Sequence, residues 1–511
     1  MSAIAPRNYA PAPTTHAPTA RPASTGNAKS KPTPSSAAPL TAPPLQAKDS
    51  PPAKVSTLVD DGNLIARLST ITPPSPPSDG DSLTKNATED TLILETGDRS
   101  DTIHVSNRAD GRLNVVVNDK TYIFNVKTER DGSPTTLHIK SNGGDDRITI
   151  DPDVKLPVTV EAGDGDDHVK AGGGTTRLFG GKGNDYLQLG SADGYAEGND
   201  GDDTMVGGTG NMVMYGNNGR DRLYAGGGTA GKKSHLDGGS DADELYAGNG
   251  HTVMNGGLGD DLLVGHDRTT FYSGKGSDTI WSNNRDDRVY AKTSDRFFNA
   301  HGAVLTAITP SEAGKEGFSI QGTPDDKQRI EDDFELLRSS PIGQQMLAEM
   351  DTAARRNGAP VQVKRSDRSQ FDYDRNKPSP PPNQKVPETP DEYHIHNGTR
   401  GRSATDSIIG YGTANSLNPA RHGSPIVGFY HEMAHAYNAV TGSFLPGTTK
   451  EHTTVDTPNY ERQAVGLPTG AQPFDFDNDP RTPPTSTNPT PFTENAIREE
   501  MGHTRRESYV E

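Results

Sequence analysis

Apolar residues recur along this chain with three different spacings, and each spacing predicts a different kind of structure. From about 90 to 140 they alternate with polar residues in short runs such as Thr102-Ile-His-Val-Ser106, which is the period of a half-buried β-strand. Turn-forming residues at 109–111 and 118–120 separate these runs. We therefore expect β-hairpins in 90–140, forming a cap for the segment that follows.

Residues 142–290 repeat a short pattern about every 18 positions. This segment holds 33 of the chain's 56 glycines, and each Gly- and Asp-rich turn is followed by a short run with large apolar residues, such as Tyr186-Leu187 or Leu262-Leu263. A fixed period of this size predicts a solenoid, in which each coil buries its apolar residues only against its neighbours.

Farther along the chain the apolar spacing becomes helical. Residues 329–338 and 341–350 predict two helices joined at Ser339-Ser340. The segment from about 425 to 440 is apolar on most sides, which predicts a buried helix that stops at Gly442.

Short strands are expected at 361–365 and 407–410, and a last helix is expected to run from Thr493 toward Tyr509. Residues 329–511 are therefore expected to form an α+β domain. Residues 291–328 carry few strong apolar runs and are expected to connect this domain to the solenoid, so that the two fold independently.

Composition changes the picture at the N-terminus. The first 80 positions hold 16 of the chain's 40 prolines, mixed with Ala, Ser and Thr, so residues 1–85 are expected to be a disordered leader. The fold class is therefore multidomain: a disordered N-terminus, a parallel β-roll or β-solenoid, and the α+β domain.

Charge and residue usage exclude several functions. A net charge of −18 opposes binding to nucleic acid, and no apolar run is long enough to span a membrane. The chain has no cysteine, so a metal site must be built from His, Asp and Glu. A protein partner and a monomeric state are expected.

The chemistry of the chain centres on the buried helix. His431 and His435 lie one helical turn apart on one face, where both imidazoles can bind one metal ion. Glu432 between them can take a proton from the attacking water. This pattern, His-Glu-x-x-His, is typical of zinc proteases, so the α+β domain of residues 329–511 is expected to be zincin-like.

Zinc usually has three protein ligands in such sites, so a third must follow the two histidines. Glu461 is our prediction, and His452 and Asp456 are the alternatives. The Glu-x-x-Ala pattern that begins at Glu461 resembles the second zinc helix of the gluzincins. A metzincin would need glycine and histidine where the chain has Asn438 and Thr441.

The C-terminal part, from about 325 to 511, resembles the NleD-like zinc metalloproteases, which are delivered into host cells as type III effectors. The resemblance is carried by Leu337 to Gly343, His431 to Asn438, Glu461 to Pro468, and Thr493 to Arg498 with Arg506 to Tyr509. It implies a secreted virulence protease that cuts a host signalling protein in the host cell cytoplasm. Members of this type cut mitogen-activated protein kinases.

The closing pair Arg506 and Tyr509 is a candidate donor for the oxyanion of the reaction. In a helix this spacing places both side chains on one face, and it resembles the Arg and Tyr pair of clostridial neurotoxin proteases. Arg498 is a second candidate. The alternative is an ordinary solvated terminal helix.

The turns of the repeats, such as Gly180-Gly-Lys-Gly-Asn-Asp185, resemble those of the RTX-type parallel β-roll, which binds calcium. Here the Asp-bearing turn alternates with plain turns such as Ala171 to Gly174, so oxygen ligands for Ca²⁺ would line one edge only. The candidate ligands are Asp167, Asp185, Asp203, Asp221, Asp243 and Asp261.

Two observations oppose calcium. The Gly, Asn and Asp residues could serve only the left-handed geometry of the turns, and Arg220 and Arg285 lie beside the expected ligands. The leading interpretation of the whole chain is a zinc-dependent endopeptidase. The alternative is a calcium-dependent β-roll that binds a glycan or a surface, with a C-terminal domain that catalyses nothing.

Overall fold

The computed structural model describes most of the chain. The described residues are 54–71, 89–126, 135–366, 369–373, 391–412, 424–451 and 455–509. Most of the expected leader, 1–85, lies outside them. Its described part differs from expectation, because β1 (Lys54–Asp60) and β2 (Ile65–Ile71) form an antiparallel hairpin. The signal was present in the sequence: alternating apolar residues flank the turn at Asp61-Gly62, and Leu64 and Ala66 are buried.

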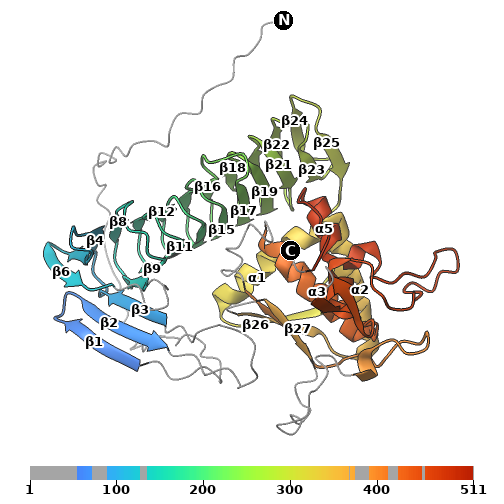
Figure 1. The fold of residues 1–511 in the computed structure, drawn as a ribbon. Helices are drawn as coiled ribbons and strands as arrows, with labels where there is room; N and C mark the ends of the chain where they lie inside the picture. Colours follow the sequence, from blue (N-terminus) through green and yellow to red (C-terminus); the bar gives the residue numbers. More distant parts are fainter. Residues whose placement is uncertain are drawn as a thin grey trace, which may run out of the picture. The chain divides into compact units, whose positions relative to one another are not determined.

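Two long sheets dominate the described residues before 308 (Figure 1). The first has 13 strands in the order β1, β2, β3 (Glu89–Glu95), β7 (Thr136–Lys140), β9 (Val158–Asp164), β11 (Thr176–Lys182), β13 (Gly194–Asp200), β15 (Met212–Asn218), β17 (Lys233–Ser240), β19 (His251–Leu258), β21 (Arg268–Tyr272), β23 (Arg288–Ala291) and β25 (Val304–Ala307). From β3 to β25 its neighbouring strands run parallel.

The second sheet has 12 strands and supplies the opposite side of each coil. Its order is β24 (Arg296–Asn299), β22 (Thr279–Ser282), β20 (Leu262–Val264), β18 (Glu244–Tyr246), β16 (Arg222–Tyr224), β14 (Thr204–Val206), β12 (Tyr186–Gln188), β10 (His168–Lys170), β8 (Arg147–Ile150), β4 (Thr102–Asn107), β5 (Leu113–Val117) and β6 (Lys120–Phe124). The strands β4, β5 and β6 pair antiparallel, which confirms the predicted hairpins, and β4 joins them to the parallel coils.

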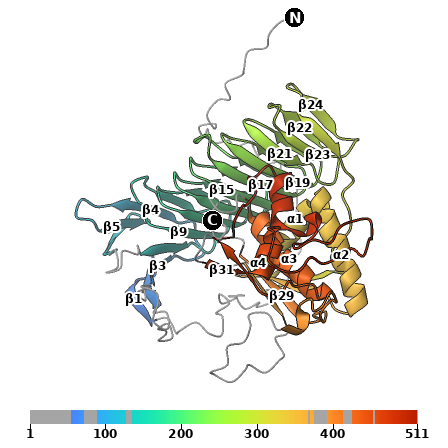
Figure 2. The same ribbon diagram turned by 45° about the vertical axis from the view of Figure 1, so that its right-hand side comes forward.

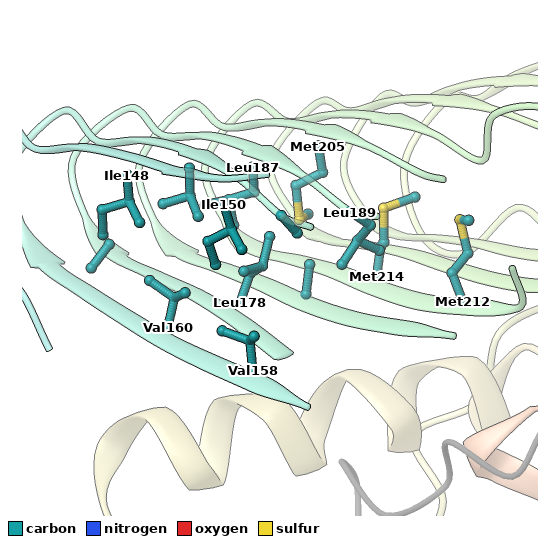
Figure 3. Close-up of a cluster of buried hydrophobic side chains, with 14 of the residues drawn as sticks. Ile148, Ile150, Val158, Val160, Leu178, Leu187, Leu189, Met205, Met212 and Met214 are labelled. Carbon is teal, nitrogen blue, oxygen red and sulfur yellow. The ribbon is translucent and has the colours of Figure 1, made fainter. Parts of the chain in front are cut away.

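The core of the solenoid is two stacks of apolar side chains that face each other between the sheets. In the first sheet Leu178 pairs in register with Val160 on one side and with Ala196 on the other. In the second sheet Leu187 pairs with Val169 and Met205. Figure 3 shows members of both stacks pointing into the interior. Each coil therefore buries its apolar residues against the next coil, as the repeat predicts.

The solenoid extends beyond the predicted boundary at 290. Strands β24 and β25 continue the two sheets into the expected connector 291–328, and Phe298 of β24 stacks on Trp281 at 4.1 Å between ring centroids. The next strand, β26 (Phe318–Gln321), already belongs to the C-terminal domain. Only residues 308–317 connect the two.

The C-terminal domain is built on a mixed sheet with helices packed beside it (Figure 2). The sheet order is β26, β27 (Val361–Arg365), β29 (Ser407–Tyr411) and β28 (Gln370–Tyr373), and a separate hairpin joins β30 (Thr448–Glu451) and β31 (Val455–Pro458). The helices are α1 (Pro324–Arg338), α2 (Pro341–Asn357), α3 (Pro425–Thr441), α4 (Asn459–Val465) and α5 (Glu494–Glu500), with 3₁₀ turns at Asp391–Tyr393 and Thr490–Phe492. No helix in the described part of the chain is long and apolar enough to cross a membrane.

The predicted helices are found, but the last one is shorter than expected. α5 ends at Glu500, and the chain turns away because Gly502 adopts a left-handed conformation with φ of 80°. Arg506 and Tyr509 therefore lie on a non-helical segment, so the expectation of two side chains on one helical face is wrong.

The two domains share a buried interface, which differs from the expectation that they fold independently. From β13 onward the outward-facing positions of the first sheet are buried as well as the inward ones. Val253 and Tyr272 of the solenoid belong to the same apolar cluster as the helices of the C-terminal domain, and the Tyr272 hydroxyl donates to Glu500 at 2.9 Å. A fragment that begins at 325 would expose this surface to water.

Candidate metal and calcium sites

Helix α3 holds its histidines in a fixed, buried frame. Pro425 occupies its first turn and Gly442 ends it with φ of 62°, as the sequence predicts. Apolar side chains surround the helix, and only Gly428, His431 and Glu432 on it are partly exposed. The side chains of His431 and Glu432 therefore lie where water can reach them, and His435 is buried one turn farther along the helix.

His431, His435 and Glu461 meet at one point. The Nε2 atoms of the two histidines are 3.1 Å apart, and Oε2 of Glu461 lies 3.3 Å from His431 Nε2 and 3.2 Å from His435 Nε2. Glu461 comes from α4, whose Gln463 bonds through Asn488 to Asn438 on α3. This amide network fixes the carboxylate opposite the histidines.

The three ligand atoms suit a zinc ion in kind and in spacing. Zinc binds imidazole nitrogen and carboxylate oxygen at about 2.0–2.2 Å in a tetrahedral arrangement, which separates neighbouring ligand atoms by a little over 3 Å. The three measured separations lie in that range. Of the two alternatives for the third ligand, Asp456 is exposed on β31 and His452 lies outside the described residues.

Glu494 is a further member of the site, and we did not single it out from the sequence. Its Oε2 lies 3.0 Å from Nδ1 of His431, and its side chain is fully buried. Arg506 and Arg498 donate to its two oxygens at 3.0 and 3.2 Å. Burial alone would raise the pKa of Glu494, but His431 and the two arginines lower it to about 2. The carboxylate is therefore ionised and orients the imidazole.

Tyr509 reaches the same site from the end of the chain. Its backbone N–H donates to Glu451 at 2.9 Å, and Arg506 donates to its carbonyl oxygen and lies 5.2 Å from the centre of its ring. The side chain is largely buried beside Glu461, and both effects raise the pKa of its hydroxyl well above the usual value. Tyr509 is therefore a neutral hydrogen-bond donor.

A cavity of about 330 Å³ opens onto these residues. His431, Glu432, His435, Glu461 and Tyr509 form one part of its wall. The other part comes mainly from β28 and from aromatic side chains: Ser369, Gln370, Phe371, Tyr373, Phe444 and Tyr460. Burial raises the pKa of Glu432, which makes it a stronger base than an exposed glutamate.

The six predicted calcium ligands form a regular ladder along one edge of the solenoid. Oδ1 of each aspartate accepts the backbone N–H of the corresponding residue one coil earlier, as Asp203 does from Asp185 at 2.7 Å. None of the six has a positive φ, whereas Asn199, Asn217 and Asp241 in the turns do. Turn geometry therefore does not explain why these positions are aspartate.

The second oxygen of each aspartate is buried without a hydrogen-bond partner within the described residues. This holds for Oδ2 of Asp167, Asp185, Asp203, Asp221, Asp243 and Asp261. The backbone packs closely against this oxygen, because a Cβ added at Gly198 would lie only 2.0 Å from Asp203 Oδ2. Arg220 and Arg285 are both exposed, so neither guanidinium enters the ladder. A row of buried, unpaired carboxylate oxygens suits a cation.

An ammonium group already occupies such a position at the end of the ladder. Nζ of Lys292 lies 2.8 Å from Asp278 Oδ2, 2.6 Å from the carbonyl oxygen of Gly274 and 3.2 Å from Asp295 Oδ1. On the opposite edge, Nζ of Lys232 donates to three carbonyl oxygens at 2.6–2.8 Å. Oxygen atoms of the turns therefore surround a lysine ammonium group of the chain itself at each edge.

Comparison with known proteins gives matches to two family models. Residues 314–509 match Peptidase_M91, described as an effector protein. Residues 159–191, 197–229 and 235–266 match the RTX calcium-binding nonapeptide repeat. No curated protein and no solved structure matched the chain. The C-terminal domain is thus similar to effector peptidases and the solenoid to calcium-binding repeats, while the narrower NleD-like type stays a prediction.

Proposed function

We propose that this protein is a zinc-dependent endopeptidase that acts as a secreted effector on a host protein. The convergence of His431, His435 and Glu461 within 3.3 Å, at the wall of a cavity, supports the proposal most strongly. The match of 314–509 to an effector peptidase family supports it independently. Cleavage of a protein substrate by the full-length chain, abolished by a metal chelator and restored by zinc, tests it.

The residues of the site have separate roles in the proposed reaction. His431, His435 and Glu461 would hold the zinc ion, which would supply Lewis-acid polarisation of the scissile carbonyl. Glu432 takes a proton from the attacking water and passes it to the leaving amine. The Tyr509 hydroxyl donates to the oxyanion that develops on the substrate.

Arg506 is a positioning residue in this proposal. Its guanidinium is engaged by Glu494 and by the carbonyl of Tyr509, so it holds the tyrosine in place and does not face the substrate. Arg498 is likewise directed at Glu494.

Mitogen-activated protein kinases are the first substrates to test, because the NleD-like resemblance implies them. The aromatic wall of the cavity favours an apolar or aromatic side chain next to the cleaved bond. Delivery into the host cell cytoplasm belongs to the same proposal.

Replacing Tyr509 by phenylalanine should slow turnover by about 10²–10³-fold, since one oxyanion donor is lost. Metal content should not change, because the tyrosine is not a ligand. Steady-state kinetics with metal analysis would measure both. Tyr460→Phe, in the same cavity wall, is the matched control. If Tyr509→Phe cleaves as fast as wild type, the oxyanion donor is another group.

A second function, calcium binding by the solenoid, is favoured by the unpaired Oδ2 atoms of the ladder. We propose that Ca²⁺ binds between successive coils at Asp167, Asp185, Asp203, Asp221, Asp243 and Asp261, with turn carbonyls as further ligands. Calcium then serves as a stabilising ion of the solenoid and leaves the chemistry to the C-terminal domain.

Without calcium, the solenoid should lose stability as the pH rises from about 4 toward 8. Burial raises the pKa of the ladder carboxyls, to about 6 for Asp167, 8 for Asp203 and 10 for Asp243. The folded chain therefore holds protons that the unfolded chain has already released, so the free energy of unfolding falls as the pH rises through these values.

Millimolar Ca²⁺ should raise the unfolding temperature strongly at pH 8 and little at pH 5, where protons compete for the carboxylates. Thermal unfolding in a chelator, in Ca²⁺ and in Mg²⁺ measures this. Asp203→Asn should weaken the calcium response, whereas Asp202→Asn at the exposed neighbouring position should not. If Ca²⁺ does not raise the unfolding temperature at pH 8, the aspartates only accept the hydrogen bonds of the ladder and the calcium proposal fails.

Replacing Lys292 by methionine should create a further calcium site at Asp278. In a chelator the variant should be less stable by about 3 kcal/mol, because Asp278 loses its buried cationic partner. Calcium should restore the stability and bind in one additional equivalent, measured by calorimetry. Lys182→Met, which removes an exposed ion pair, is the control. A variant that binds no more calcium than wild type would show that Ca²⁺ cannot take the position of the Lys292 ammonium beside Asp278.

A further inference from the structure

A second cluster of metal-ligand types lies between the solenoid and the C-terminal domain. His235 and Asp237 occupy alternate positions of β17, and Asp333 lies on α1. All three side chains are fully buried. Their ligand atoms lie within 4.8 Å of one another, yet no hydrogen bond in the described part of the chain joins any two of them. The three groups therefore lie close together without a direct hydrogen bond between any two of them.

Two of these groups have a buried polar atom without a hydrogen-bond partner among the described residues. The Nδ1 atom of His235 contacts the Ser424 hydroxyl at 3.2 Å, which leaves Nε2 buried and without a partner among the described residues. Oδ2 of Asp237 accepts from Asn255 at 3.0 Å, and Oδ1 has no partner there. A buried acceptor left unpaired costs about 1–3 kcal/mol, so these atoms call for a donor or a cation.

The charge of the cluster points to a cation. Three buried carboxylates, Asp237, Asp332 and Asp333, face one buried guanidinium, Arg329. Arg329 donates to Asp333 at 2.9 Å and lies over the Tyr215 ring, and its other nitrogens reach none of the unpaired acceptors. Burial raises the pKa of Asp237, Asp332 and Asp333, and ionising all three would leave the cluster with two negative charges in excess. A divalent ion would balance them.

We propose that His235, Asp237 and Asp333 bind a divalent transition-metal ion of the zinc or manganese type, which joins the solenoid to the C-terminal domain. One imidazole nitrogen with two carboxylate oxygens is a ligand set for such ions and not for calcium, which prefers six to eight oxygens. The full burial of the ligands makes the site structural, because no open position faces solvent. It is separate from the site at His431 and does not depend on it.

The test begins by removing the ligands of the other site. The full-length His431→Ala/His435→Ala variant, refolded with Zn²⁺ or Mn²⁺ and dialysed, should retain about one tightly held metal ion per chain by mass spectrometry. Adding Asp237→Asn should remove this ion and lower the unfolding temperature. Asp241→Asn, at an exposed carboxylate just after β17, should leave both unchanged.

Two results would overturn the proposal. One is a double variant that holds no metal after loading with either ion. The other is an Asp237→Asn variant that keeps its metal content or becomes more stable. Asp237 would then be protonated in the folded protein and would not be a metal ligand. If Asp237→Asn does not fold, anomalous X-ray scattering from crystals of the double variant decides without it. A peak beside His235 supports the site, and its absence in metal-loaded crystals refutes it.

Discussion

Glu432→Gln should lose about 10²–10⁴-fold in turnover while keeping the metal at His431, His435 and Glu461. An amide of the same size fills the same place in the cavity wall, but it cannot accept the proton of the attacking water. Single-turnover cleavage of a protein substrate, set beside metal analysis of the same sample, measures both quantities.

The control for this substitution is Glu499→Gln, which changes an exposed carboxylate of α5 that does not line the cavity. It should cleave like wild type. If Glu432→Gln cleaves at an undiminished rate with its metal bound, another group acts as the base and the proposed mechanism fails.

The His431→Ala/His435→Ala variant should lose about one zinc ion per chain relative to wild type and all cleavage activity. Two of three ligands disappear, and water does not replace imidazole nitrogen without a large loss of affinity. Metal content is compared with that of Glu432→Gln, which removes a charge from the same helix face and no ligand. A double variant that keeps the full zinc content of wild type would show that these histidines bind none.

Glu494→Gln removes the carboxylate that orients His431 but removes no proposed metal ligand. Loss of a carboxylate behind a metal-binding histidine typically costs 10–100-fold in metal affinity or activity. The metal affinity and the activity of this variant should therefore lie between those of wild type and those of the double histidine variant.

The fold was largely predictable where a period repeats. The 18-residue repeat and the inward apolar residues determine the coils, because each coil contacts only its neighbours. The ends were harder to place, since β24 and β25 carry exposed apolar residues such as Val304 and no Gly-rich turn of the repeat type. The hairpin β1–β2 was hidden within proline-rich composition, although its own alternation was visible.

The interface was not predictable from periodicity. Arg329, Asp332 and Asp333 on α1 have the composition of a solvated helical face, yet all three are buried against the solenoid. Only the position of the solenoid strands shows this, because Tyr215 donates to Asp333 and Asn217 donates to Asp332 across more than 100 residues of sequence. The residue types within α1 give no information about contacts with such distant residues.

The candidate site was predictable where its geometry is local. The spacing of His431 and His435 within one helix is sufficient to place both imidazoles, and the structure places Glu461 Oε2 3.2 Å from His435 Nε2. Glu494 was missed because its role depends on a contact 63 residues away. The sign that could have found it is Arg498, four residues later, whose charge keeps a buried glutamate ionised.

Anomalous X-ray scattering at the zinc edge, from crystals of full-length Glu432→Gln, tests the central claim most directly. We predict a peak within about 2.0–2.2 Å of His431 Nε2, His435 Nε2 and a carboxylate oxygen of Glu461. Zinc-loaded crystals with no peak between these three side chains would contradict the account.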